Sequence, residues 1–110
     1  MSSAVYYDFK IADASLEKEL KSQSIEFDYK KVLKRNIKSV DGDITIVLTG
    51  LGTIAAILIT TDKAITVKID SNAVSVTKFI FIDGTLTTLA VACSDATGAL
   101  VEVTVWGKSS

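Results

Sequence analysis

The sequence predicts an all-β fold, a mainly antiparallel sandwich or jelly-roll-like barrel, with one short helix near the N-terminus. Apolar and polar residues alternate along many short segments, as in residues 65–70, which is the period of a strand with one buried face. Turn-forming Gly, Asp, Ser and Thr separate these segments. A length of 110 residues and a hydrophobic content of 48% suit a single domain with one core.

The N-terminal segment begins with a strand signal over residues 5–11, typical of an edge strand or of an arm that pairs with a neighbour. A helix is predicted next, capped by Asp13 or Ser15 and ending at about residue 21. Two turns of helix are too short to be stable alone, so we expect its apolar stripe to dock on the sheet or on a partner subunit. The pairs that favour a helix here are Leu16 with Leu20, one turn apart, and Glu17 with Lys21.

A second strand signal, with a charged outer face, follows at residues 25–29. Residues 30–38 then carry five positive charges among apolar residues and fit either a helical turn or an extended segment. Three roles stay open for this basic run: a solvated strand face, a contact with an acidic protein surface, or a phosphate-binding stripe. Flanking acidic residues weaken its field, which makes nucleic acid an unlikely partner.

The C-terminal two thirds of the chain predict six strands, and immunoglobulin-like and jelly-roll topologies both fit their spacing. A tight turn is expected at residues 70–72, and Asp83-Gly84 is a hairpin signal. Because residues 79–82 are apolar at every position, we expect them to lie deep in the core. The predicted strands are residues 44–49, 53–60, 64–70, 73–82, 86–93 and 99–106.

These signals divide the chain into two parts. Residues 1–40 form a strand, helix and basic segment that we expect to dock on a partner, and residues 41–110 form the β-sandwich. The sequence contains no proline, which is a common means of protecting sheet edges. Charge, the N-terminal segment or assembly must protect them instead, and the many Thr, Ser and Ala positions favour a homo-oligomer.

No residue pattern predicts catalysis, a metal site or a cofactor. There is no histidine, and the single cysteine, Cys93, lies in an apolar strand where we expect it to be buried. The glycines of residues 49–53 lack the lysine and the helix of a phosphate-binding loop. Four aspartates in predicted turns are better explained by local backbone hydrogen bonding than by hydrolysis: Asp62, Asp70, Asp83 and Asp95.

A membrane role is also not predicted. The N-terminus lacks the basic and apolar regions of a signal peptide. The most apolar window, residues 44–60, is interrupted by threonines and glycines and falls short of the roughly 18 apolar residues that a spanning helix needs. We therefore expect a soluble protein made in the cytoplasm.

The chain from about Val40 to Gly107 resembles small β-sandwich structural proteins of tailed bacteriophages. The resembling phrases are ILITTDKAITVKI at residues 57–69, FIFIDGT at residues 79–85, and residues 89–107 with their SDATG turn and terminal VEVTVWG. Proteins of this class serve as capsid decoration, neck or fibre-like components. The resemblance implies a virion location after synthesis in the host cytoplasm, with other virion structural proteins as partners.

The leading prediction is therefore a non-enzymatic virion protein that self-assembles and docks on other virion proteins. The alternative is a carbohydrate- or receptor-binding module on the same fold, with Trp106, Tyr6 and Tyr7 as stacking residues. The candidate residues for the protein interface are Tyr7, Phe9, Leu16, Leu20, Lys30, Lys31, Lys34, Arg35, Lys38 and Trp106.

Overall fold

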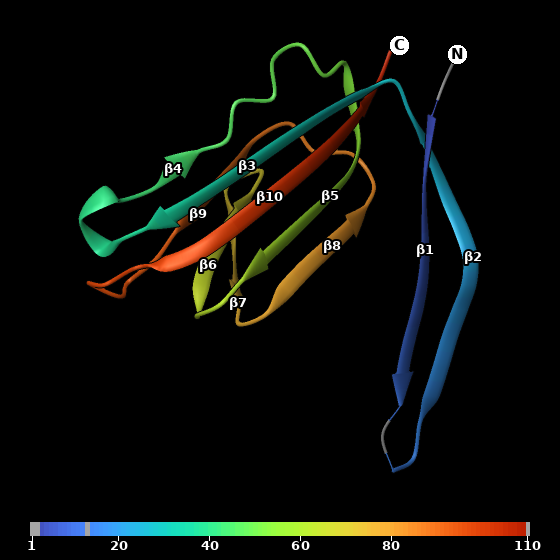
Figure 1. The fold of residues 1–110 in the computed structure, drawn as a ribbon, viewed down its shortest axis with the longest axis horizontal. Helices are drawn as coiled ribbons and strands as arrows, with labels where there is room; N and C mark the ends of the chain where they lie inside the picture. The colour runs from blue at the N-terminus through green and yellow to red at the C-terminus, as the bar shows by residue number, and fades with distance from the viewer. Residues whose placement is uncertain (1–2, 13, 110) are drawn as a thin grey trace.

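A computed structural model describes residues 3–12 and 14–109, which form a β-sandwich and a two-stranded arm beside it (Figure 1). The all-β prediction is confirmed, and within the described residues the only helical element is a single turn of 3-10 helix at Ser39–Asp41. The strands are β1 (Ser3–Ala12), β2 (Glu17–Phe27), β3 (Tyr29–Ile37), β4 (Ile44–Thr45), β5 (Thr53–Thr61), β6 (Ile65–Ile69), β7 (Asn72–Val76), β8 (Phe79–Asp83), β9 (Leu89–Ala92) and β10 (Ala99–Lys108).

The sandwich consists of two four-stranded antiparallel sheets, in the orders β3-β10-β5-β8 and β4-β9-β6-β7. Residues 29–37 therefore form an edge strand of the sandwich, and β1 pairs with β2 to form the separate arm. The segment of residues 1–40 thus contains both the arm and one strand of the main sheet. Among the described residues, no helix is long or apolar enough to cross a membrane.

The core lies between the two sheets. Along β10, the odd-numbered residues from Ala99 to Val105 are all buried, because a strand presents alternate side chains to opposite faces. Ile57 and Ile59 of β5 pair with Val105 and Val103 and are fully buried beside them. The opposite sheet contributes buried residues that include Val67, Leu89 and Val91. Cys93, which directly follows β9, is buried with them, so the predicted burial of the cysteine is confirmed.

The predicted N-terminal helix is wrong, because β2 occupies most of that segment. Charged side chains pair as a strand pairs them: Lys21 Nζ lies 2.9 Å from Glu19 Oε1, two residues away on the same strand, and Lys10 Nζ lies 3.4 Å from Glu17 Oε1 across the arm. Of the two predicted helix caps, Ser15 lies in the bend before β2 and Asp13 lies outside the described residues.

The strand predicted over residues 73–82 is also wrong in part, because the chain changes sheet at Thr77-Lys78. β7 pairs with β6, whereas β8 pairs with β5 in the opposite sheet. β8 lies at the edge of its sheet, so residues 79–82 are not deep in the core, and Phe79 is 56% exposed. The Asp83-Gly84 signal does not produce a hairpin, because β8 and β9 belong to different sheets.

The predicted turn at residues 70–72 joins β6 to β7 in a tight hairpin. Ile69 pairs with Asn72, and the two loop residues Asp70 and Ser71 both have positive φ, as a type I′ turn requires. The Asp70 carboxylate accepts hydrogen bonds from the backbone N–H groups of Thr87 and Thr88 and from the Thr87 hydroxyl, at 2.8–2.9 Å. These hydrogen bonds, first that of the Thr88 N–H, hold the pKa of Asp70 below its ordinary value.

We expect Asp70→Asn to lower the melting temperature of the protein at neutral pH. We also expect the melting temperature of this variant to fall less than that of the parent when the pH is lowered. Because the pKa of Asp70 is lowered in the folded chain, its contribution is present above the ordinary value of 3.8 and is lost as pH falls through the lowered pKa. Melting temperatures between neutral pH and strongly acidic pH would measure both effects. Glu102→Gln, on β10, controls for the loss of one negative charge. Parallel melting profiles for Asp70→Asn and the parent would contradict this role.

Candidate functional site

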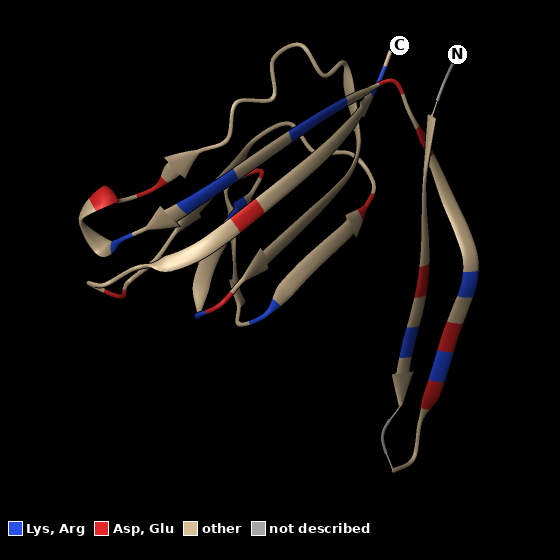
Figure 2. Ribbon diagram, in the orientation of Figure 1, with Lys and Arg blue, Asp and Glu red and all other residues tan. Residues whose placement is uncertain are grey.

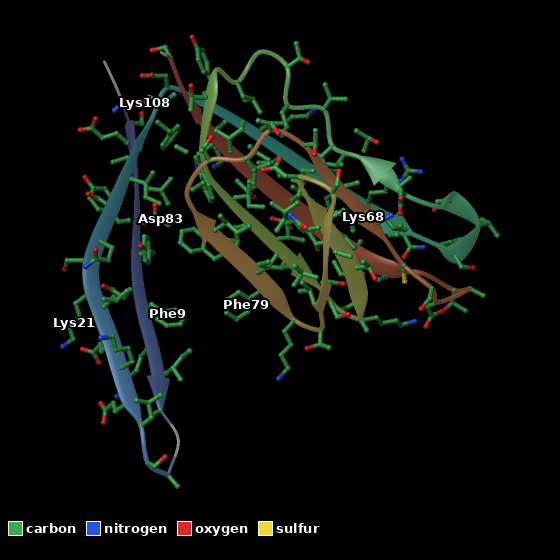
Figure 3. All side chains as sticks on the ribbon, turned by 180° about the vertical axis from the view of Figure 1, so that it is seen from behind. Phe9, Lys21, Lys68, Phe79, Asp83 and Lys108 are labelled. Atoms are coloured by element: carbon green, nitrogen blue, oxygen red, sulfur yellow. The ribbon has the colours of Figure 1, made fainter. Side chains whose placement is uncertain are left out.

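The arm has one largely apolar side. Val5, Tyr7, Phe9 and Ile11 alternate along β1, and the register places Ile25, Gln23, Leu20 and Lys18 opposite them on β2. This side, which we call the arm face, consists of Val5, Tyr7, Phe9, Ile11, Leu20 and Ile25. Figure 3 shows Phe9 on the side toward the sandwich and Lys21 on the side away from it. The arm is therefore amphipathic.

A bulge in the arm lies near its middle. The register shifts between Tyr7 and Phe9, and Ser22 has a φ of 57°, which non-glycine residues rarely adopt. The Ser22 N–H donates to Asp8 Oδ1 at 2.7 Å, so a side chain fixes the irregularity. The bulge returns Leu20 to the same side as Phe9, so beyond it this side carries Phe9, Ile11 and Leu20 together with Lys18.

The base of the arm is fixed to the end of the sandwich. The Asp28 N–H donates to the Gly107 carbonyl at 2.8 Å, and Asp28 Oδ2 accepts from the Ser109 N–H and hydroxyl at 2.7 and 2.8 Å. Lys108 Nζ lies 3.1 Å from Glu26 Oε2. β2 also approaches β10 and β5. The arm thus starts from an anchored point on the sandwich.

Tyr7 forms a contact with β8 above this base. Its hydroxyl donates to Asp83 Oδ2 at 2.9 Å, and its ring lies 4.8 Å from the ring of Phe81, measured between centroids. The hydrogen bond to the Asp83 carboxylate raises the pKa of Tyr7, and the nearby negative charge acts in the same direction. The predicted interface residue Tyr7 therefore contacts its own chain.

The distal half of the arm extends away from the sandwich (Figure 1). Ile11 is 49% exposed and Leu16 is 55% exposed, and Leu20 is also exposed. Tyr6 points from the opposite side of the arm and is exposed as well. Exposed charges alternate in sign on both arm strands (Figure 2). The apolar residues predicted for the interface, Phe9, Leu16 and Leu20, are thus gathered on the arm.

A second exposed apolar surface lies on the outer side of the β3-β10-β5-β8 sheet. Pairing aligns Val32, Thr104, Leu58 and Phe81 in one row across all four strands. Val32 and Phe79 are each more than half exposed, and Leu100 is exposed as well. We call this surface the sheet face, and its apolar members are Val32, Leu58, Phe79, Phe81 and Leu100. Thr104 is buried in the row of Val32, and the next row combines Phe79 with the polar residues Lys34, Glu102 and Thr60. The sequence did not predict this surface, and both Phe79 and Phe81 were expected to lie deep in the core.

The basic run of residues 30–38 extends along β3 and does not form a single stripe. Alternation sends Lys30 and Lys34 to the outer side of the sheet and Lys31 and Arg35 to the other side. Lys31 Nζ donates to the Val47 carbonyl at 2.8 Å, which fixes the loop after β4. Lys38 follows the strand, and its N–H donates to Asp41 Oδ2. Figure 2 shows the basic residues spread along β3.

Trp106 is only 8% exposed, although it does not belong to the core between the sheets. It pairs with Lys30 on one side and with Ala56 on the other, in the row next to that of Val32. Because β2 approaches β10 and β5, the base of the arm covers this part of the outer side. Trp106 therefore packs where the arm and the sandwich meet.

The four turn aspartates act as structural hydrogen-bond acceptors. Asp62 Oδ1 accepts from the Leu100 N–H at 2.8 Å, and Asp83 accepts from Tyr7. Asp95 Oδ1 accepts from the Thr97 hydroxyl and N–H, and these hydrogen bonds lower the pKa of Asp95. Across residues 3–12 and 14–109, no group of three or more Cys, Asp or Glu side chains is placed to hold a metal ion.

A groove of about 660 Å³ opens between the loop after β4 and the loop before β9. Its lining combines threonine hydroxyls with apolar side chains such as Ile46, Ile54 and Leu86, and it contains no charged residue. The groove therefore offers neither an acid nor a base for catalysis.

Comparisons with known proteins leave the chain without an assigned family. No model of a known protein family matches the sequence, and a search of curated proteins finds no match. Among solved structures, a protein described as ethanolamine utilization protein Q from Salmonella typhimurium matches over 98% of this chain and 99% of its own, with a TM-score of 0.34 and 8% sequence identity.

Proposed function

We propose that this protein is a non-enzymatic structural component of a tailed-phage virion, a capsid decoration or neck protein that self-assembles and docks on other virion proteins. The observation that carries this proposal is the anchored arm, whose apolar side remains exposed over its distal half. A two-stranded hairpin is at best marginally stable in water unless it packs against something. An arm of this kind suits docking on another protein. The resemblance of residues 40–107 to phage structural proteins supports virion proteins as its partners.

The alternative, a carbohydrate- or receptor-binding module, has less support from the described residues. Trp106 is buried, and the ring of Tyr7 packs on Phe81 while its hydroxyl is bound to Asp83. Of the three proposed stacking residues, Tyr6 alone is fully open to solvent. A hollow of about 400 Å³ beside this ring is lined by Tyr6, Tyr7, Asp8 and Ser22, but Asp8 Oδ1 already accepts from the Ser22 N–H at 2.7 Å. A sugar would therefore have one open ring to stack on, with a carboxylate beside it that is already engaged by the backbone.

Immunogold labelling of purified phage particles, with antibodies raised against this protein, tests the virion assignment. We expect label at one defined site on the particle, such as the capsid surface or the neck. Recovery of the protein only from the soluble fraction of infected cells, with unlabelled particles, would contradict a structural role.

Deleting residues 1–27 should leave a folded sandwich that assembles poorly. All strands of the two main sheets begin at or after Tyr29, and the deletion keeps Asp28 with its hydrogen bond to Gly107. Circular dichroism would report the fold, and sizing by light scattering would report the assembly. Because this deletion uncovers Trp106, a second variant carries Trp106→Thr as well. If both variants unfold, the arm is part of the core fold and not a docking element.

A further inference from the structure

The free side of β3, which we call the β3 edge, is an open sheet edge nine residues long. β3 pairs with β10 on its other side (Figure 1). The Asp62 N–H donates to the Leu100 carbonyl, so the even-numbered residues of β10 bond toward β5 and the odd-numbered ones bond to the odd-numbered residues of β3. Four residues therefore direct backbone N–H and C=O groups to the β3 edge, where no described residue bonds to them: Lys30, Val32, Lys34 and Asn36.

The basic run of residues 30–38 lies along this edge, and no acidic side chain pairs with its cations. Lys31 Nζ donates to a backbone carbonyl, which leaves its positive charge in place. Glu102 stands opposite Lys34 on β10, but no ion pair joins the two side chains. The ion pairs between described residues use other cations, namely Lys10, Lys21, Lys63, Lys68 and Lys108. The β3 edge therefore presents uncompensated positive charge (Figure 2).

These cations project to both sides of the sheet. Lys30 and Lys34 lie on the outer side, and Lys31 and Arg35 lie on the other side. A nucleic-acid site gathers its phosphate-binding residues on one face, which this arrangement does not do. A β-strand added to the β3 edge would have its own side chains alternating between the same two sides, so it could reach all four cations. Two β3 edges cannot serve each other, because cations would then lie opposite cations.

We propose that the β3 edge binds an acidic strand of a different protein, which extends the sheet by backbone hydrogen bonds. The proposal rests on the docking part of the proposed function and adds a surface separate from the arm. Along β3, two cations, two apolar residues and two cations follow one another at residues 30–35. A matching strand therefore carries two acidic, two apolar and two acidic residues in succession. The sequence of this chain contains no two adjacent acidic residues, so the partner is not a second copy.

A capped peptide of sequence Thr-Glu-Glu-Val-Val-Glu-Glu-Thr tests the proposal on the full chain by NMR at low salt. We expect the amides of Val32 and Lys34 to gain protection from hydrogen exchange when this peptide binds. The amides of Leu33 and Arg35, which face β10, should be protected already. A second peptide has proline at both valine positions, which keeps the charge but prevents strand pairing. A thymidine oligonucleotide of similar length is the nucleic-acid probe.

We expect the valine peptide to bind more tightly than the proline peptide, and its affinity to fall as salt is added. Equal binding of the two peptides would overturn the proposal, because charge alone would explain it. Tighter binding of the oligonucleotide would overturn it in favour of a nucleic-acid site. If millimolar valine peptide leaves the amides of β3 unchanged, the cations serve only to keep other strands away from the edge.

Lys34→Gln combined with Arg35→Gln should weaken binding of the valine peptide about fivefold, the effect of losing two exposed ion pairs. The matched control combines Lys18→Gln with Lys78→Gln, which removes the same charge from the arm and from the crossing between β7 and β8. This control should bind the peptide nearly as the parent does. Circular dichroism checks that both double variants are folded. Equal weakening by the two would place the peptide elsewhere than on the β3 edge.

These results separate the proposal from the virion assignment. Peptide binding at β3 without labelling of phage particles would support the edge site and contradict the phage role. Labelled particles without peptide binding would leave the phage role standing and overturn the edge site.

Discussion

Gly107→Ala should destabilise the sandwich by about 3 kcal/mol or more, at the upper end of the range for overpacking. A Cβ at Gly107 would overlap the carbonyl oxygen of Leu51, a backbone atom that cannot rotate away. Leu51 is itself buried, and its loop passes directly over the end of β10. Gly107 also supplies the carbonyl that accepts from Asp28, so the substitution should loosen the base of the arm as well.

Urea unfolding of Gly107→Ala and Gly84→Ala would measure this effect. Gly84 is the matched control because the nearest atom to its added Cβ, Ile82 Cγ2, lies at 4.0 Å, an ordinary contact. We expect Gly84→Ala to change the free energy of unfolding by no more than about 0.5 kcal/mol, the usual range for surface positions. Equal losses at the two glycines would show that the loop can move away from β10.

Ile57→Ala should cost about 2–5 kcal/mol, the usual range for truncating a buried isoleucine. Ile57 is fully buried on the central strand β5, between Val105 of β10 and Ile82 of β8. The surrounding residues belong to paired strands on both sides, so they cannot collapse into the space that the truncation leaves.

Ile80→Ala provides the comparison, because it makes the same chemical change on β8 at the edge of the sheet. Ile80 packs against the core but is only half-buried, so we expect it to cost clearly less than Ile57→Ala. Denaturant midpoints of the two variants would decide between them. A larger loss at Ile80 would mean that β8 contributes more to the core than its burial indicates.

The sequence predicted most strands because one period dominates the C-terminal two thirds. Alternation in β6 and β10 matches their observed faces, and the tight turn expected at residues 70–72 is present between β6 and β7. The error at residues 73–82 has a physical cause. Alternation describes one strand at a time and carries no signal for the point where a chain crosses from one sheet to the other.

The helix prediction failed because a spacing of four residues fits both periods. Leu16 and Leu20 are one turn apart on a helix, but four is also an even number, so a strand places them on the same side. The better signal was cross-strand: Phe9 pairs with Leu20, and Lys10 pairs with Glu19. Such pairing depends on a partner strand that local spacing does not identify.

Of the two exposed apolar surfaces, only the residues on the arm could be predicted from the sequence. Tyr7 and Phe9 were identified from alternation, Leu16 and Leu20 were identified from a helical spacing that proved wrong, and all four lie on the arm. The sheet face was missed, since Phe79 and Val32 are ordinary strand residues until the sheet order exposes them. Trp106 was identified as an interface candidate. It packs where the base of the arm meets the sandwich, and the position of that base cannot be predicted from the local sequence.

The position of β10 between β3 and β5 has a consequence for synthesis on the ribosome. Every other strand of the sandwich is translated before β10, yet β3 has no partner in the sheet until β10 emerges and inserts beside it. Pairing between strands so distant in sequence is slow. Until β10 is available, β3 and the facing edge of β5 remain unpaired in the nascent chain. Leu100 and Thr104 of the sheet face also arrive with β10. The outer side of this sheet is therefore complete only after β10 has been translated and has inserted between β3 and β5.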